Sequence, residues 1–144
     1  MKNYFSITLL VGLFILAGVT DSSAQKAKKY DNPQWKNVVF VDYVSGKAGR
    51  ANEIISDYYI PASVKAGISG PEMALVMQTG PWDVMIIWHM AGGLDDMNWD
   101  IHPNNVKWRK ALSEICGGDD KASEILKEYA SCVARSSSAL GRVR

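Results

Sequence analysis

The sequence contains few of the residues from which metal and redox sites are built. Its 144 residues include two cysteines and two histidines. The histidines, His89 and His102, do not have a recognised metal-binding spacing. No Cys-X-X-Cys, His-Glu-X-X-His, glycine-rich phosphate loop or nucleophile elbow is present. These absences argue against zinc-protease, nucleotide and serine-hydrolase chemistry.

An excess of charge of one sign is also absent. Lysine and arginine together number 16, aspartate and glutamate 15, and 47% of the residues are hydrophobic. Disorder would require low hydrophobicity with high net charge, and a nucleic-acid site would require a basic patch. The lysines of residues 26–29 and the arginines near the C-terminus do not form one. We therefore expect one globular domain with no nucleic-acid partner.

The N-terminus has the features of a secretory signal peptide. Lys2 precedes an apolar run over residues 7–19, and the small residues Ser22 and Ala24 precede Gln25. This pattern predicts a signal peptide over residues 1–24, with cleavage before Gln25. The alternative is an uncleaved membrane anchor, but the run is shorter than the roughly 20 residues that span a bilayer. We expect an exported protein, periplasmic or extracellular, with no stable membrane anchor after cleavage.

The remaining chain alternates between strand and helix patterns. Residues 25–35 are a polar lead-in that we expect to be flexible. The β-branched and aromatic segment 38–44 predicts a strand. From Ala51 the apolar residues recur at helical spacing, Pro61 should kink or restart that helix, and Gly67 should end it. Two short strands, 73–79 and 83–90, follow as a hairpin.

Two further helices are predicted before an undecided tail. Pro103 begins a helix that ends at Cys116, and Asp119 should cap another that ends near Val133. A straight last helix would place Cys116 and Cys132 about 20 Å apart, and a disulfide needs Cα atoms within about 7 Å. Two free, buried thiols are therefore predicted. The sequence of the tail from Arg135 does not distinguish between a last edge strand and a poor helix.

This order predicts one α+β domain over residues 36–144, with helices on one face of an antiparallel sheet. All three predicted strands are apolar on both faces. A sheet with one solvated face would alternate between apolar and polar residues. Something must cover the face that the helices leave open, and a second copy of the same sheet is the simplest candidate. We therefore expect a homodimer.

Several segments together resemble a known superfamily. The first helix carries Tyr59-Ile60-Pro61 and Lys65-Ala66-Gly67, and the hairpin passes through Thr79-Gly80-Pro81-Trp82-Asp83 into a strand that ends Trp88-His89. Over roughly residues 36–116 this pattern looks like the dimeric α/β barrel superfamily, which is ferredoxin-like, and within it like NIPSNAP or antibiotic-synthesis monooxygenase proteins. The helix after Gly118 departs from the simplest form of the pattern.

The resemblance implies a dimer and leaves the function open. Members of the superfamily typically pair two sheets into a barrel and hold ligands between sheet and helices. They include cofactor-free monooxygenases, isomerases, haem-binding and haem-degrading proteins, and members with no known activity. One fold hosts many chemistries, so the function must be argued from the site itself.

The candidate ligand pocket is rich in aromatic and methionine side chains. The sequence has five tryptophans and six methionines, and nine of these residues lie between positions 73 and 108. Such side chains suit an apolar cavity for a planar ligand, although they also fill cores and interfaces. The residues that we expect to line a pocket are Tyr43, Tyr58, Met85, Trp88, Trp99 and His102.

Two polar residues are the candidates for catalysis. His89 ends the third strand, and Asp42 interrupts an apolar strand where an unpaired carboxylate would be costly to bury. Both also have ordinary structural explanations, as do Asp95, Asp96 and Asp100, which we expect in turns and caps.

Two functions of different classes follow. The first is an exported dimer that binds a small apolar or aromatic ligand without turnover or cofactor. The alternative is a cofactor-free monooxygenase or isomerase that uses His89 and Asp42 on an aromatic substrate, with Tyr58 or Tyr59 orienting it. A haem-binding variant would use His89 or His102 as axial ligand. No residue pattern requires catalysis, so the first is favoured.

Overall fold

A computed structural model describes residues 26–144 of the protein. The predicted signal peptide and its cleavage point lie outside the described residues. Residues 26–31 contain no helix or strand, and residues 32–144 form one compact unit. The first strand begins at Trp35, three residues before the predicted one.

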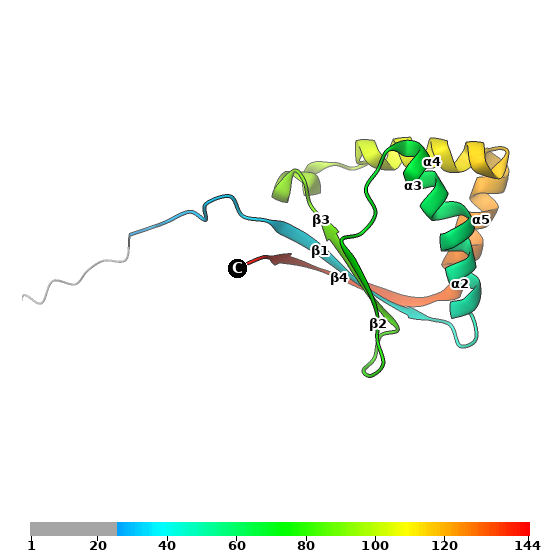
Figure 1. Ribbon diagram of the computed structural model, residues 1–144, viewed down its shortest axis with the longest axis horizontal. Helices are drawn as coiled ribbons and strands as arrows, with labels where there is room; N and C mark the ends of the chain where they lie inside the picture. The colour runs from blue at the N-terminus through cyan, green and yellow to red at the C-terminus, as the bar shows by residue number, and fades with distance from the viewer. Residues whose placement is uncertain (1–25) are drawn as a thin grey trace, which may run out of the picture. The chain divides into compact units, whose positions relative to one another are not determined.

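Four antiparallel strands form one sheet in the order β2-β3-β1-β4 (Figure 1). The strands are β1 (Trp35–Tyr43), β2 (Met73–Val76), β3 (Val84–His89) and β4 (Val133–Arg142). Strands and helices alternate as β-α-β-β-α-β, with two helices in the second α position. This is the ferredoxin-like arrangement, and it confirms the predicted α+β class.

The C-terminal tail is a strand. β4 pairs with β1 along its whole length, from Trp35 opposite Arg142 to Tyr43 opposite Val133, with a bulge between Asp42 and Tyr43. Serine is a weak helix former, and three consecutive serines at 136–138 lie in this strand. Pairing with β1 decides the question that the weak sequence pattern left open.

The first helical segment has three parts. α2 (Ala48–Ile54) continues into a π-helical stretch, η1 (Ile55–Tyr59), and then into α3 (Ile60–Ala66). Pro61 is the second residue of α3 and lies directly after the π-helical stretch, where the helical hydrogen-bond pattern changes. The predicted kink or restart falls at the junction of η1 and α3, which begins one residue before Pro61. Gly67 ends the segment in the left-handed conformation, with φ of 66°.

A short 3₁₀ helix and two long helices follow β3. They are η2 (Gly93–Asn98), α4 (Pro103–Cys116) and α5 (Asp119–Cys132). The predicted cap at Asp119 is wrong, because Gly118 takes the cap position with φ of 140°, a value that a side chain would strain. The Asp119 carboxylate instead accepts a hydrogen bond from the Ser113 hydroxyl.

The two cysteines are free thiols separated by the length of α5. Cys132 is buried, whereas Cys116 is only half-buried, so the prediction of two buried thiols holds for Cys132 alone. Burial raises the pKa of the Cys116 thiol, although Lys121 opposes this shift.

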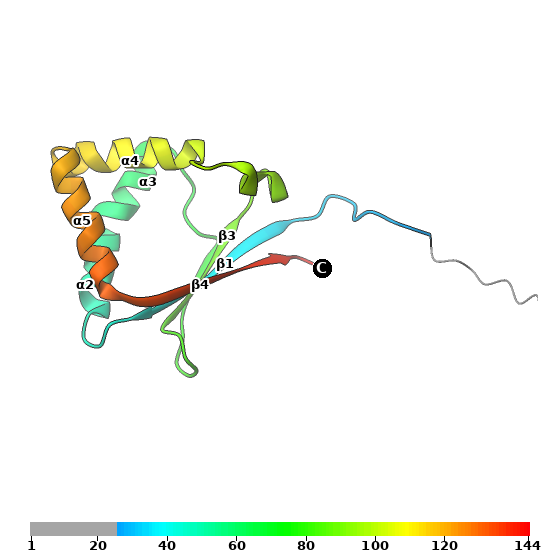
Figure 2. The ribbon, with the colours of Figure 1, turned by 180° about the vertical axis from the view of Figure 1, so that it is seen from behind.

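The helices lie on one side of the sheet (Figures 1 and 2). They contact it mainly at one end, where Val41 and Tyr43 of β1 pack against Ala51 of α2 and Cys132 of α5. A second cluster lies within the helical layer, where Ala62 of α3 meets a set of residues from α4 and α5: Ala111, Leu112 and Ala122. The helical layer therefore has a core of its own.

No helix within residues 26–144 is long and apolar enough to cross a membrane.

Candidate functional site

An apolar pocket of about 390 Å³ lies between the helical layer and the sheet. Its helical wall comes from α2, η1, α3 and α5, and its sheet wall comes from β2, β3 and the end of β1. The apolar lining includes Ile55, Ile60 and Val64 on the helical side and Ile86 and Trp88 on the sheet side. The volume is in the range of pockets that hold small molecules.

The pocket exists because α3 packs against other helices rather than against the sheet. Ala62, on the buried face of α3, contacts the second cluster around Leu112. Ile60 and Val64, on a different side of α3, line the pocket. Close packing of α3 onto α4 and α5 thus leaves the space between α3 and the strands unfilled.

One end of the pocket carries a pair of tyrosines. Tyr43, at the end of β1, and Tyr129, on α5, both line the pocket. Burial, followed by the Tyr129 side chain that hydrogen-bonds to it, raises the pKa of Tyr43 well above its usual value. The Tyr43 phenol is therefore neutral at physiological pH. The backbone N–H of Tyr43 donates a hydrogen bond of 2.8 Å to the Asp83 carboxylate, which anchors the end of β1.

A third tyrosine, Tyr59, adjoins this pair. Its ring lies 5.1 Å from that of Tyr129 and 5.0 Å, edge-on, from that of Trp108. Its carbonyl accepts hydrogen bonds from the Trp108 indole and the Ser63 hydroxyl. Burial raises the pKa of Tyr59 to about 12, and Tyr129 adds to the shift.

Among residues 26–144, none that lines the pocket carries a formal charge. Apart from the three tyrosines, the polar side chains of this wall are those of Asn52 and Ser63, and no histidine, cysteine, acidic or basic residue of the described chain lines it. The nearby charges are engaged with one another outside the pocket. Arg50 donates two hydrogen bonds to Glu128, at 2.6 and 3.0 Å, and a third to Glu53. The site can therefore enclose an apolar molecule and hydrogen-bond to it, but it offers no counter-ion.

The structure divides the expected site residues between the two faces of the sheet. Tyr43 and Trp88 line the pocket. Met85 and His89 alternate with the pocket-lining residues of β3, and Asp42 precedes Tyr43 on β1, so these three side chains lie on the opposite face. The two candidates for catalysis are thus separated from the pocket by the sheet.

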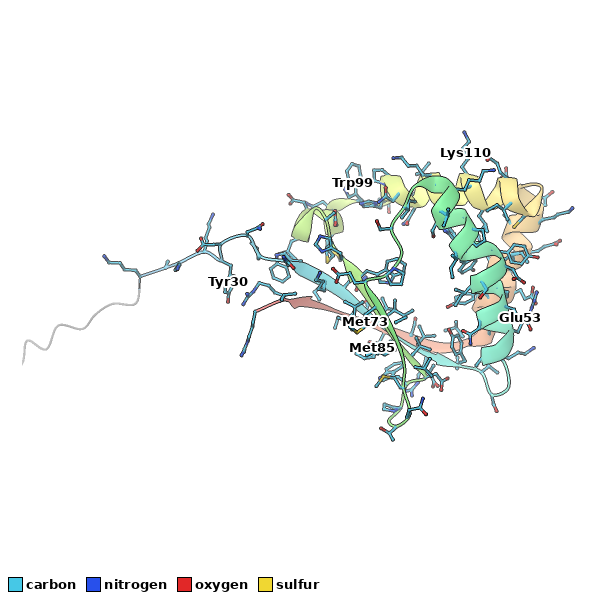
Figure 3. The ribbon with its side chains drawn as sticks, viewed as in Figure 1. Tyr30, Glu53, Met73, Met85, Trp99 and Lys110 are labelled. Carbon is cyan, nitrogen blue, oxygen red and sulfur yellow. The ribbon has the colours of Figure 1, made fainter. Side chains whose placement is uncertain are left out.

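The other three expected residues also lie outside the pocket wall. Tyr58 packs on the cluster within the helical layer. Trp99 and His102 form an edge-on ring pair with centroids 6.0 Å apart (Figure 3 shows Trp99 beside the start of α4). His102 caps α4, because its Nδ1 accepts a 3.1 Å hydrogen bond from the N–H of Asn104, and its Nε2 lies 3.7 Å from Asp96.

The methionines and tryptophans do not gather at one site. Met90 is buried, whereas Met97 and Trp99 are exposed near η2, and Trp108 packs within the helical layer. Of the nine residues between positions 73 and 108, only Trp88 lines the pocket. The aromatic character of the pocket comes mainly from tyrosines.

Sequence reasoning missed Tyr129 and Asn52. Tyr129 belongs to the apolar stripe of α5, and its spacing alone predicts a core position. One signal could have found Tyr129. It places a hydroxyl on an otherwise apolar helix stripe that is predicted to face the sheet carrying Tyr43. Asn52 sits next to the buried Ala51 on α2 and carries no sequence signal of its own.

The outer face of the sheet, opposite the pocket, is apolar at its centre. Val38 and Phe40 of β1 are in register with Ile87 and Met85 of β3, which in turn face a pair from β2: Met73 and Leu75. Met73 and Leu75 are 48% and 42% exposed, and Leu75, on the edge strand, also borders the pocket. Figure 3 shows Met73 and Met85 on neighbouring strands.

Charged groups flank this apolar centre on both sides. At one end Lys36 donates a hydrogen bond to Glu72 and lies 3.2 Å from His89 Nδ1. At the other end Arg135 donates to Asp42 at 2.9 Å and stacks over the Trp82 ring at 4.5 Å. Asp42, whose carboxylate interrupts the apolar pattern of β1, is thus paired with Arg135. Among residues 26–144, no cluster of histidine, cysteine and acidic side chains could hold a metal ion.

Comparisons with known proteins identify the fold. No family model and no curated protein matches the sequence. A solved structure of a NIPSNAP family protein from Agrobacterium tumefaciens superposes with a TM-score of 0.53 at 15% identity, covering 83% of this chain and 93% of its own. A second, a NIPSNAP family protein with unknown function from the same organism, has a TM-score of 0.53 at 11% identity and coverage of 81% and 94%.

The chain has the fold of NIPSNAP family proteins. The resemblance drawn from residues 36–116 pointed to this group, and the structural similarity covers 83% of the chain. Identities this low establish shared architecture only, so the function rests on the chemistry of the pocket.

The buried Tyr59 predicts a loss of stability at high pH. Its pKa rises from 10.0 to about 12 on folding, so between these values the unfolded chain binds fewer protons and the free energy of unfolding falls as pH rises. Below pH 10 the stabilisation is fully present. Tyr59→Phe should make the decline between pH 10 and 12 shallower in denaturant titrations. Identical pH slopes for the wild type and the variant would contradict this assignment.

Proposed function

We propose that the protein binds a small apolar or aromatic molecule in this pocket, without turning it over. The observation that carries the proposal is an apolar cavity of about 390 Å³ with tyrosine hydroxyls at one end and no charged group in its wall. Burying a ligand there removes apolar surface from water, which contributes a favourable binding free energy of about 25 cal/mol per Å². The hydroxyls can orient the ligand.

An oxygenase or isomerase acting in the same pocket is not supported. Proton abstraction needs a base within hydrogen-bond reach of the substrate. His89 and Asp42 lie on the outer face, where they contact Lys36 and Arg135. The raised pKa values of Tyr43 and Tyr59 keep both phenols protonated, so neither supplies a base at neutral pH.

Haem does not fit this pocket. An axial ligand would have to be a histidine, cysteine, methionine or tyrosinate. The described part of the wall contains none of the first three, and burial raises the pKa of Tyr43 and of Tyr59, which disfavours a tyrosinate at either position. His102 is occupied as the cap of α4. The residues present therefore favour an organic ligand without a cofactor.

Nile red, an uncharged apolar dye, tests the binding proposal. We expect saturable binding with a blue shift of the dye's emission. Ala74→Trp, at a lining position of β2, should fill the space and weaken binding at least about tenfold, or about 1.4 kcal/mol.

Ala48→Trp, at the exposed start of α2, is the matched control and should bind like the wild type. Absence of saturable binding by the wild type, or equal binding by the Ala74→Trp protein, would refute the proposal.

We further propose that two copies of the chain associate through the outer faces of their sheets. The apolar centre formed by Val38, Phe40 and their neighbours on β2 and β3 is what supports this assembly. Helices cover only the other face (Figure 2). Sheets that pack face to face bury such side chains in a layer about 10 Å thick. A two-fold axis would bring identical patches together.

Light scattering at micromolar concentration should give the mass of a dimer. Met73→Lys places a charge at an exposed position of this face and should shift the equilibrium toward monomer. Val106→Lys, at an exposed position of α4, is the control and should leave the mass unchanged. A monomeric wild type would end the proposal.

The site is proposed to act outside the cytoplasm. The support is the apolar run over residues 7–19, flanked by Lys2 and by the small residues before Gln25. Mass spectrometry of the protein recovered from the exported fraction should show a chain that begins at Gln25. Retention of the full-length chain in the cytoplasm would contradict export.

A further inference from the structure

The pocket is elongated and its two ends differ chemically. Asn37 of β1 is in register with Trp88, and Tyr43 lies six positions further along the same strand. At about 3.3 Å per residue this places the two pocket-lining side chains up to about 20 Å apart along the sheet. The Tyr43 end carries the phenol groups. At the Trp88 end the segment before β2 runs beside β3, because the Glu72 N–H donates to the Ile87 carbonyl, and this segment contributes Ile68 and Pro71 to the wall.

The edge of the pocket between α3 and β2 is also apolar. Val64 of α3 is 75% exposed, and Val76 of β2 is 73% exposed, yet both contribute to the wall. β2 is the edge strand of the sheet. A ligand entering on this side meets Val64 and Val76 first, and Ser63 is the polar side chain that α3 contributes to the wall.

The polar end offers neutral hydrogen-bonding groups alone. A phenol hydroxyl donates one hydrogen bond and accepts others. Glu128, which is on α5 like Tyr129, is held by Arg50, and Glu53 on α2 is held by the same guanidinium. No cation in the wall is available to a ligand carboxylate, which would lose its hydration without gaining a counter-ion.

We propose that the pocket selects an elongated, uncharged amphiphile, whose apolar body lies along β3 and whose terminal hydroxyl or carbonyl contacts Tyr43 and Tyr129. The corresponding carboxylate is rejected because the site cannot compensate its charge. This inference rests on the proposed binding function and adds the class of ligand to it.

Three ligands of equal chain length test the selection at pH 8. They are 1-decanol, methyl decanoate and decanoate, each used to displace Nile red from the wild-type protein. Decanol and the ester should compete at least about tenfold more strongly than the carboxylate, because only the carboxylate brings a charge into the site.

A double variant tests the role of the two hydroxyls. Tyr43→Phe combined with Tyr129→Phe keeps both rings and should weaken decanol binding about threefold to tenfold, the effect of one lost hydrogen bond. The affinity of the double variant for Nile red is measured first, so that displacement by decanol is compared at equal dye occupancy. Tyr58→Phe, whose ring packs within the helical layer, is the matched control and should behave like the wild type.

The outcomes separate this inference from the proposal beneath it. Decanoate that competes as well as decanol, or full decanol affinity in the double variant, would overturn the ligand class while leaving the binding function intact. Failure of Nile red itself to bind would overturn the binding function. A circular dichroism spectrum matching the wild type shows that the double variant is folded.

Discussion

Packing of α3 against α4 and α5 is the interaction on which the pocket depends. Ala62 meets Leu112 and its neighbours inside the helical layer, so α3 has a partner other than the sheet. At the opposite end of the sheet, Tyr43, Ala51 and Cys132 join the two layers directly. The layers are therefore in contact at one end and apart along the rest, and the space between them is the site.

Two glycines and a proline make this arrangement possible. Gly117 and Gly118 adopt φ values of 80° and 140°, which allow the chain to turn sharply between α4 and α5. α3 begins at Ile60, with Pro61 as its second residue, directly after a π-helical stretch that carries Tyr59. A π-helical turn inserts an extra residue into the helix and rotates the side chains that follow. Local backbone geometry thus directs Ile60 and Val64 to the pocket.

The candidate site could be predicted only in part. Tyr43 and Trp88 were named from the sequence, and both line the pocket. Asp42, Met85 and His89 were named with them and lie on the other face. Alternation along a strand separates its residues into two sets, but strands that are apolar on both sides do not reveal which set faces the helices. His89 and Asp42 stood out as polar residues in apolar strands, and their partners Lys36 and Arg135 come from other strands.

The sequence by itself determined the order of the elements up to α5 and the α+β class, because hydrophobic period, proline and glycine act on neighbouring residues. The ferredoxin-like fold was implied by the resemblance of its segments to a known superfamily. Tertiary structure alone decided that the tail is a strand, because its serine-rich segment pairs with β1, whereas its own sequence pattern favours neither strand nor helix. It also decided that a pocket exists and that it is uncharged. Both depend on where α3 and α5 come to lie against the sheet, which is a balance of packing between segments distant in sequence.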